Sequence, residues 1–158
     1  MQRKLIFSLC LLGFSVTHAQ SAVAECPYTA AELSRALGAL VKGERPNTTA
    51  FAGGKMKICE YGEYPLSVRV ERLVMDKPSA ADIASYQTMF AGKNEKIPND
   101  ADNAVWQTGQ GDLEGVTLHY YRGNIHTQFR VSLPAADIKT PAKVAEMRKK
   151  VLALRRLP

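Results

Sequence analysis

Apolar residues recur at helical spacing in three stretches of this chain, and the first stretch carries a full set of helix-start signals. Thr29 and Glu32 have the spacing of a capping box, in which each side chain can satisfy the other residue's backbone amide. Tyr28 and Leu33 stand at the two positions of a hydrophobic staple. Gly43 is expected to end this helix. Its apolar face comprises Leu33, Leu37, Leu40 and Val41.

Two further helices are predicted in the second half of the chain. One starts at Ser79, with Asp82 in the capping position, and ends at Gly92. The other starts at Thr140-Pro141 and closes the chain, because proline suits the first helical turn. Their apolar faces are Ile83, Tyr86 and Phe90 in the former, and Val144, Met147, Val151 and Leu154 in the latter.

Alternation of apolar and polar residues predicts strands at 55–61, 66–73 and, around Trp106, at 104–108. Residues 44–54 and 92–103 lack any periodicity and are expected to be loops. In the first strand Met56 and Ile58 alternate with Lys57 and Cys59, and in the second Leu66, Val68 and Val70 alternate with Ser67, Arg69 and Glu71.

The clearest local signal is a hairpin formed by residues 116–121 and 125–133, with Gly123-Asn124 as a two-residue turn. This register puts every apolar pair on one face, and a slip of one residue would destroy that segregation. The apolar face pairs Val116 with Val131, Leu118 with Phe129, and Tyr120 with Thr127; the other pairs Thr117 with Arg130, His119 with Gln128, and Tyr121 with His126.

The predicted order is α-β-β-α-β-β-β-α, which indicates an α+β fold with one antiparallel sheet of about five strands flanked by three helices. Tight turns favour antiparallel pairing, and the helices are expected to cover mainly one face of the sheet.

Residues 1–19 have the pattern of a secretory signal peptide, with a basic start, a short apolar core and small residues at the end. Cleavage is expected after Ala19 or Ala24, which leaves a single domain over 25–158. The protein is therefore expected to be periplasmic or secreted. No later segment is apolar for the roughly 18 residues of a membrane helix.

Export changes how the cysteines are interpreted. Cys10 lies within the leader, whereas Cys26 and Cys59 remain and are expected to form a disulfide. Their spacing matches no metal-ligand pattern, and an oxidising compartment disfavours a reduced thiol. Glu25 precedes Cys26, where a lipoprotein signal requires a small residue, so a lipid anchor is disfavoured.

The net charge of +6 is concentrated at one end of the chain. Residues 139–158 hold seven Lys or Arg and one Glu, a local +6, whereas 20–138 hold 12 cations and 14 anions, a local −2. A basic closing helix can contact an anionic membrane peripherally. The favoured alternative is a core-packed helix with a solvated outer face. Nucleic acid is not expected as a partner.

No catalytic, metal-binding or cofactor-binding constellation is predicted, and no cofactor is expected. His119 and His126 fall diagonally on one hairpin face, roughly 7–8 Å apart at Cβ, and no third metal ligand is near in sequence. An exposed, mixed polar face is the favoured interpretation. As a partner surface it would comprise His119, Tyr121, His126, Gln128 and Arg130.

The segments Cys26-Pro27-Tyr28-Thr29-Ala30-Ala31-Glu32-Leu33, Ala36-Leu37-Gly38 and Cys59-Glu60-Tyr61 resemble those of small exported bacterial proteins grouped as domains of unknown function. The closing stretch 144–157 is similar to their basic helix. The resemblance implies a disulfide-bonded, helix-flanked antiparallel sheet without catalytic residues.

These observations favour a non-enzymatic binding module that recognises a protein or cell-envelope component through its sheet face or its basic helix. An inhibitor or immunity protein that blocks a toxin or wall hydrolase is one concrete form. The alternative is a periplasmic carrier of a small apolar ligand, in a cavity lined by Leu118, Phe129, Phe90 and Met89. A hydrolase that uses His119 or His126 is a more distant hypothesis.

Overall fold

The computed structural model describes residues 26–63, 65–89, 93–108 and 115–158. Within them the chain forms one antiparallel sheet in the order β1-β2-β3-β7-β6-β5-β4, together with four helices. In chain order the elements are α1 (Ala30–Leu37), β1 (Arg45–Phe51), β2 (Gly54–Glu63), β3 (Leu66–Met75), α2 (Ala80–Met89), β4 (Lys93–Lys96), β5 (Val105–Thr108), β6 (Gly115–Arg122), β7 (Ile125–Ser132), α3 (Ala135–Ile138) and α4 (Pro141–Leu152).

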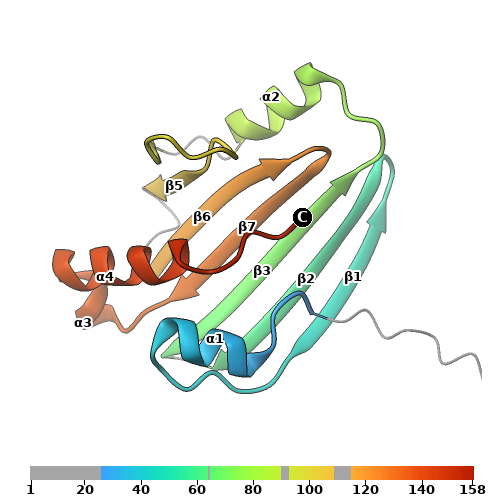
Figure 1. Ribbon diagram of the computed structural model, residues 1–158. Helices are drawn as coiled ribbons and strands as arrows, with labels where there is room; N and C mark the ends of the chain where they lie inside the picture. Colours follow the sequence, from blue (N-terminus) through green and yellow to red (C-terminus); the bar gives the residue numbers. More distant parts are fainter. Residues whose placement is uncertain (1–25, 64, 90–92, 109–114) are drawn as a thin grey trace, which may run out of the picture.

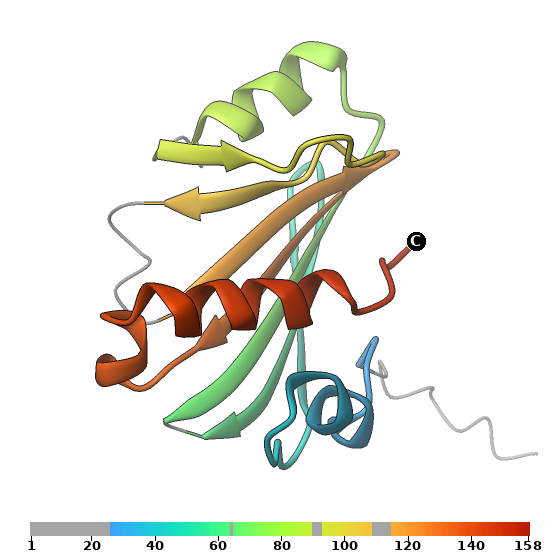
Figure 2. The ribbon, with the colours of Figure 1, turned by 60° about the vertical axis from the view of Figure 1, so that its left-hand side comes forward.

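Helices α1 and α4 pack on the same face of the sheet, which we call the helix face (Figures 1 and 2). The residues after α4 run across this face in front of the central strands (Figure 1). Helix α2 lies at the end of the sheet near β4 and β5 (Figure 2). In the part of the chain described, no helix has the length and apolar character needed to cross a membrane.

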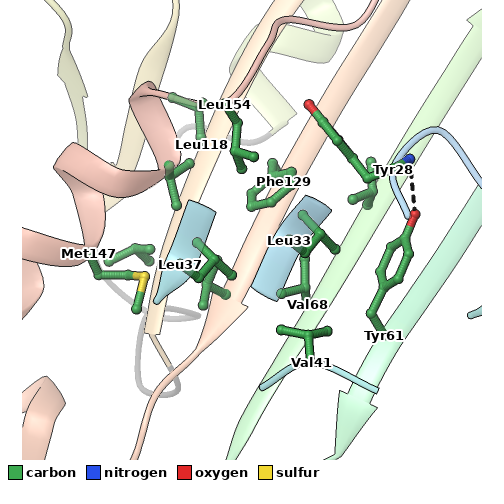
Figure 3. Packing of buried hydrophobic residues seen from close by; sticks show 14 of the residues in the cluster. Tyr28, Leu33, Leu37, Val41, Tyr61, Val68, Leu118, Phe129, Met147 and Leu154 are labelled. Atoms are coloured by element: carbon green, nitrogen blue, oxygen red, sulfur yellow. Dashed lines mark hydrogen bonds between the residues drawn. The ribbon is translucent and has the colours of Figure 1, made fainter. Parts of the chain in front are cut away.

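The core lies between the helix face and the two helices (Figure 3). Leu33 and Leu37 of α1 and Met147 of α4 meet Leu118 and Phe129 of the sheet. Each fully buried apolar side chain of this size contributes about 1.5–3 kcal/mol to folding. The buried residues of α1 and α4, which come from the apolar faces predicted for these helices, therefore help to hold the helix layer on the sheet.

The sheet has two more strands than the pattern predicted, and both lie at its edges. Segments 44–54 and 92–103 were expected to be loops, but they contain β1 and β4. All seven residues of β1 are exposed, so the strand has no buried side to produce alternation. Strand β4 (KNEK) is held by pairing with β5 and likewise has no apolar positions. The single turn α3 was also not predicted.

The first helix is shorter than expected. It ends at Leu37, because Gly38 adopts a left-handed conformation with φ 69° and its amide bonds to Ser34 O at 3.0 Å. Leu40 was predicted on the apolar face but is 73% exposed, whereas Val41 is buried beyond the helix. Gly38, and not Gly43 as predicted, therefore ends the helix.

The predicted hairpin is confirmed pair by pair. Strands β6 and β7 are joined by Gly123-Asn124, and all six predicted cross-strand pairs occur in the observed register. The turn also reaches β3, because Asn124 Nδ2 donates to Met75 O at 2.6 Å. Local sequence determines this register, since each apolar residue must face the helices.

The alternation of residues in β2 predicted the strand but did not indicate which of its two sides faces the helices. Cys59 and Tyr61 are the side chains that lie buried on the helix face, whereas Met56 and Ile58 point to the other face and are half-buried. Tyr61 Oη accepts a hydrogen bond from the Tyr28 amide (Figure 3). Contacts with the segment before α1 therefore fix the side of the strand that is buried.

The disulfide between Cys26 and Cys59 is present, with an S–S distance of 2.19 Å and Cα atoms 5.7 Å apart. It ties the segment before α1 to β2. A disulfide is the form that cysteines take in an oxidising compartment, which is compatible with the predicted export. The predicted leader, residues 1–19, and both predicted cleavage sites lie outside the described residues.

The start of α1 offers a local test of the fold. Thr29 Oγ1 accepts from the Glu32 amide at 3.1 Å, but the Glu32 carboxylate pairs with Arg155 and does not complete the box. Thr29→Ala is expected to lower the free energy of unfolding by about 1 kcal/mol, because it leaves a helix amide uncapped. Urea denaturation measures this loss. Thr29→Ser keeps the hydroxyl and should be nearly neutral; an equal loss in both variants would contradict the capping role.

Candidate functional site

The side chains predicted as a partner surface lie on the sheet face opposite the helices. His119 and Tyr121 alternate along β6 with Leu118 and Tyr120, which are buried on the helix face. His126 lies directly across from Tyr121 in the observed register. Gln128 and Arg130 of β7 follow on the same face. The five residues thus share one face, as the register predicted.

The two histidines form a hydrogen-bonded pair, and a third side chain completes it. His119 Nδ1 lies 3.1 Å from His126 Nε2, and His119 Nε2 lies 2.7 Å from Gln107 Oε1. An amide oxygen only accepts, so His119 Nε2 carries the hydrogen of the bond to Gln107. When the His119 ring is neutral, its Nδ1 accepts from His126 Nε2, and the hydrogen bonds run in one direction from His126 to Gln107.

Burial keeps both rings neutral at ordinary pH. Burial, together with smaller contributions from repulsion by His126 and Arg130, lowers the pKa of His119 to about 3. The pKa of His126 falls to about 4 for the same reason, burial. Rings with such pKa values are weak bases at neutral pH. They serve this site as fixed hydrogen-bonding groups.

The expectation of an exposed polar face is wrong for the two histidines. Each is only 3% exposed. The hairpin register placed them correctly on one face, but it contains no information about what covers that face. Strand β5, which pairs with β6 through Val105 and His119, brings Gln107 against the ring of His119. The pairing of β5 with β6 therefore adds Gln107 to the buried histidine pair.

A cavity of about 480 Å³ opens beside this cluster. Three of the predicted surface residues, His119, Tyr121 and His126, line it, whereas Gln128 and Arg130 do not. The Tyr121 and His126 rings stack with centroids 4.7 Å apart. The rest of the lining comes from the β4–β5 region and comprises Asn94, Lys96, Ile97, Asn103, Ala104 and Val105.

Sequence reasoning missed the polar part of this lining. Asn94, Lys96 and Asn103 fall in the stretch 92–103 that was expected to be a loop. Nothing in the stretch GKNEKIPNDADN sets these residues apart from ordinary solvated ones. Gln107 lies in the predicted strand 104–108, but only the pairing of β5 with β6 brings it to His119.

Metal binding finds no further support in this site. In residues 26–63, 65–89, 93–108 and 115–158, no group of three or more His, Cys, Asp or Glu side chains could hold a metal ion. The nitrogen atoms of the two imidazoles that face each other are joined by a hydrogen bond. The cavity lining presents aromatic ring faces, the amides of Asn94 and Asn103 and the cation of Lys96.

Three arginines of the basic C-terminal segment make contacts with aromatic rings and carboxylates of the fold. Arg148, Arg155 and Arg156 each lie over a core aromatic ring, at 5.1, 4.9 and 4.7 Å from the ring centroids of Trp106, Tyr28 and Tyr120. The same arginines pair with Glu95, Glu32 and Asp100 at 2.6, 3.0 and 2.6 Å. These contacts support the core-packed interpretation of the closing helix. Contact with an anionic membrane stays a prediction.

Comparison with known proteins identifies no relative: no protein family, no curated protein and no solved structure matches this chain.

Proposed function

We propose that this protein is an exported, non-enzymatic binding module that recognises a protein or cell-envelope component through the sheet face of the histidine pair. The observation that carries the proposal is the cavity of about 480 Å³ beside His119, Tyr121 and His126. A concave site with apolar and aromatic walls and a few convergent polar groups is the usual form of a ligand site.

Two features favour this face over the basic helix. Arg148, Arg155 and Arg156 are engaged with core rings and carboxylates, so they contribute less to an outward cationic surface. Lys96, by contrast, is exposed at the rim of the cavity. An inhibitor or immunity protein would use such a rim to orient its target, because exposed charges at a rim steer association.

A recognition role also suits the chemistry better than catalysis. General acid–base catalysis requires a group whose pKa lies near the working pH. The pKa values of His119 and His126, about 3 and about 4, lie well below neutrality. The hydrolase hypothesis therefore has less support than binding.

The alternative function, a carrier of a small apolar ligand between sheet and helices, has no specific support. Leu118 and Phe129, two of its four predicted lining residues, belong to the packed core and are each 2% exposed. The side chains of Met89 and Phe90 lie outside the described residues.

A charge reversal at the rim tests the proposed function. The full chain is expressed with its leader in a bacterial host, recovered from the exported fraction, and incubated with purified cell-wall sacculi and with solubilised envelope proteins. Lys96→Glu is expected to weaken retention of the bound component at least tenfold, a loss of about 1.4 kcal/mol. Lys149→Glu on α4 is the matched control, because Lys149 is also exposed.

The proposal is wrong if the unchanged protein retains no envelope component. It is also wrong if Lys149→Glu weakens retention as much as Lys96→Glu, since binding would then involve the helix or charge in general.

A further inference from the structure

A second, smaller cavity lies on the helix face, away from the histidine pair. It measures about 110 Å³ and is lined in part by Thr48, Lys57 and Arg72. These three residues form one row across neighbouring strands, because Thr48 of β1 pairs with Lys57 of β2, and Lys57 pairs with Arg72 of β3. Cys59 and Val70, the next pair along β2 and β3, also line it. The rest of the lining comes from Pro46 and Asn47 of β1 and from Pro27, which precedes α1.

The two cations of this row lie directly opposite each other on β2 and β3. Lys57 and Arg72 are directly opposite and half-buried, and like charges in this arrangement destabilise a sheet. Within the described residues, neither reaches an Asp or Glu side chain within 4.0 Å. Their neighbours on β2 and β3, Glu60 and Glu71, point to the opposite face, where both pair with Arg69.

Most other half-buried cations in the described residues pair with a carboxylate. This group comprises Arg69, Arg122, Arg148, Lys150 and Arg156, each within 3.2 Å of an Asp or Glu oxygen. Lys57 and Arg72 pair with no Asp or Glu side chain in the described residues, and they share a cavity. A bound anion in this cavity would offset the repulsion between the two cations.

The guanidinium of Arg72 is positioned to contribute to such a site. Its Nη2 donates to Pro158 O, which holds the side chain against the residues after α4. Its Nε is buried and has no hydrogen-bond partner within the described residues. A buried donor without a partner costs about 1–3 kcal/mol, so a ligand oxygen at this position would be stabilising.

We propose that the cavity between Lys57 and Arg72 binds a phosphate group. A phosphate monoester carries a charge of about −1.5 to −2 at neutral pH, opposite in sign to the two cations, and offers three strong acceptor oxygens. Arginine presents a planar fork that fits such oxygens, and lysine adds a point charge. The Thr48 hydroxyl, at the end of the row, supplies a further donor. This site does not depend on the proposed function, since it lies on the other face of the sheet.

Titration with inorganic phosphate tests the site directly. ¹⁵N NMR spectra of the purified protein are recorded at constant ionic strength while phosphate replaces chloride, and the Arg72 Nε–H and Lys57 amide signals are followed. Both are expected to shift and saturate. Lys57→Gln should weaken the apparent affinity at least tenfold. Lys55→Gln is the matched control, because Lys55 is an exposed lysine two residues away on β2 that does not line the cavity.

A second arm separates the two sources of a phosphate group. Co-sedimentation with phosphatidylcholine vesicles, with and without phosphatidic acid, tests a lipid headgroup. Binding of inorganic phosphate, or of the phosphatidic acid vesicles alone, supports the site if Lys57→Gln weakens it and Lys55→Gln does not. The absence of saturation at about 10 mM phosphate together with no vesicle binding overturns the proposal. Binding that is equal in the two variants also overturns it.

Discussion

Removal of the Cys26–Cys59 bond is expected to lower the free energy of unfolding by about 3–4 kcal/mol, because the bond closes a loop between residues 33 positions apart. This is a large share of the roughly 5–15 kcal/mol that stabilises a domain of this kind. The loop contains α1 and β1, so an unfolded chain without the bond gains the freedom of both elements. Urea denaturation of Cys59→Ser and of the double serine variant measures the loss.

Reductant supplies the control for this expectation. It should lower the melting temperature of the unchanged protein to about that of the double serine variant, and it should leave the variant unaffected. A lower yield of exported Cys59→Ser protein is expected as well. If melting of the unchanged protein is the same under reducing and oxidising conditions, the bond does not stabilise the fold.

Acidification is expected to destabilise the protein steeply between about pH 6.5 and 4. Both histidines have lowered pKa values in the folded state, about 3 for His119 and about 4 for His126, against 6.5 for a free side chain. In this window the unfolded chain binds protons that the folded chain excludes. The free energy of unfolding therefore falls as pH falls, by up to about 1.4 kcal/mol per pH unit for each histidine. Above pH 6.5, the pKa of the unfolded side chains, the full contribution of the two neutral histidines to stability is retained.

A comparison restricted to pH 5–6.5 isolates the histidines. Hydrogen bonds from Ser79 lower the pKa of the Asp82 carboxyl, and Lys150 lowers that of Glu146, so both of these carboxyls titrate below the pH range of the histidines. Urea midpoints measured across this range give the slope. His126→Gln is expected to reduce the slope by about half, since one proton-excluding group remains. Equal stability at pH 5 and 6.5, or an unchanged slope in the variant, would contradict the buried neutral pair.

These two expectations differ in how far the sequence alone supports them. The disulfide was predicted from the expected export and from the two cysteines that follow the predicted leader, and the structure confirms the bond. The acid sensitivity does not follow from the sequence, which favoured an exposed polar face for His119 and His126. The disulfide could be predicted from the number of cysteines, whereas the burial of a side chain depends on which segments, distant in sequence, cover it.

The candidate site shows the same division. The hairpin register predicted that His119, Tyr121 and His126 share one face, and they do. The cavity beside them also requires β4 and β5, of which only β5 was predicted. Edge strands such as β4 are held by backbone hydrogen bonds to one neighbour and need no apolar side chains, so their sequences carry little signal.

What the sequence by itself determined is the set of elements with a buried side: the capped first helix, the hairpin of β6 and β7 with its register, and the inner stripe of the closing helix. In these elements each residue's environment follows from the positions of its near neighbours in the chain. The tertiary structure alone decided the edge strands, the early end of α1, the burial of the histidine pair and the opposed Lys57 and Arg72. Each of these depends on contacts between segments far apart in sequence, and neither periodicity nor local propensity records such contacts.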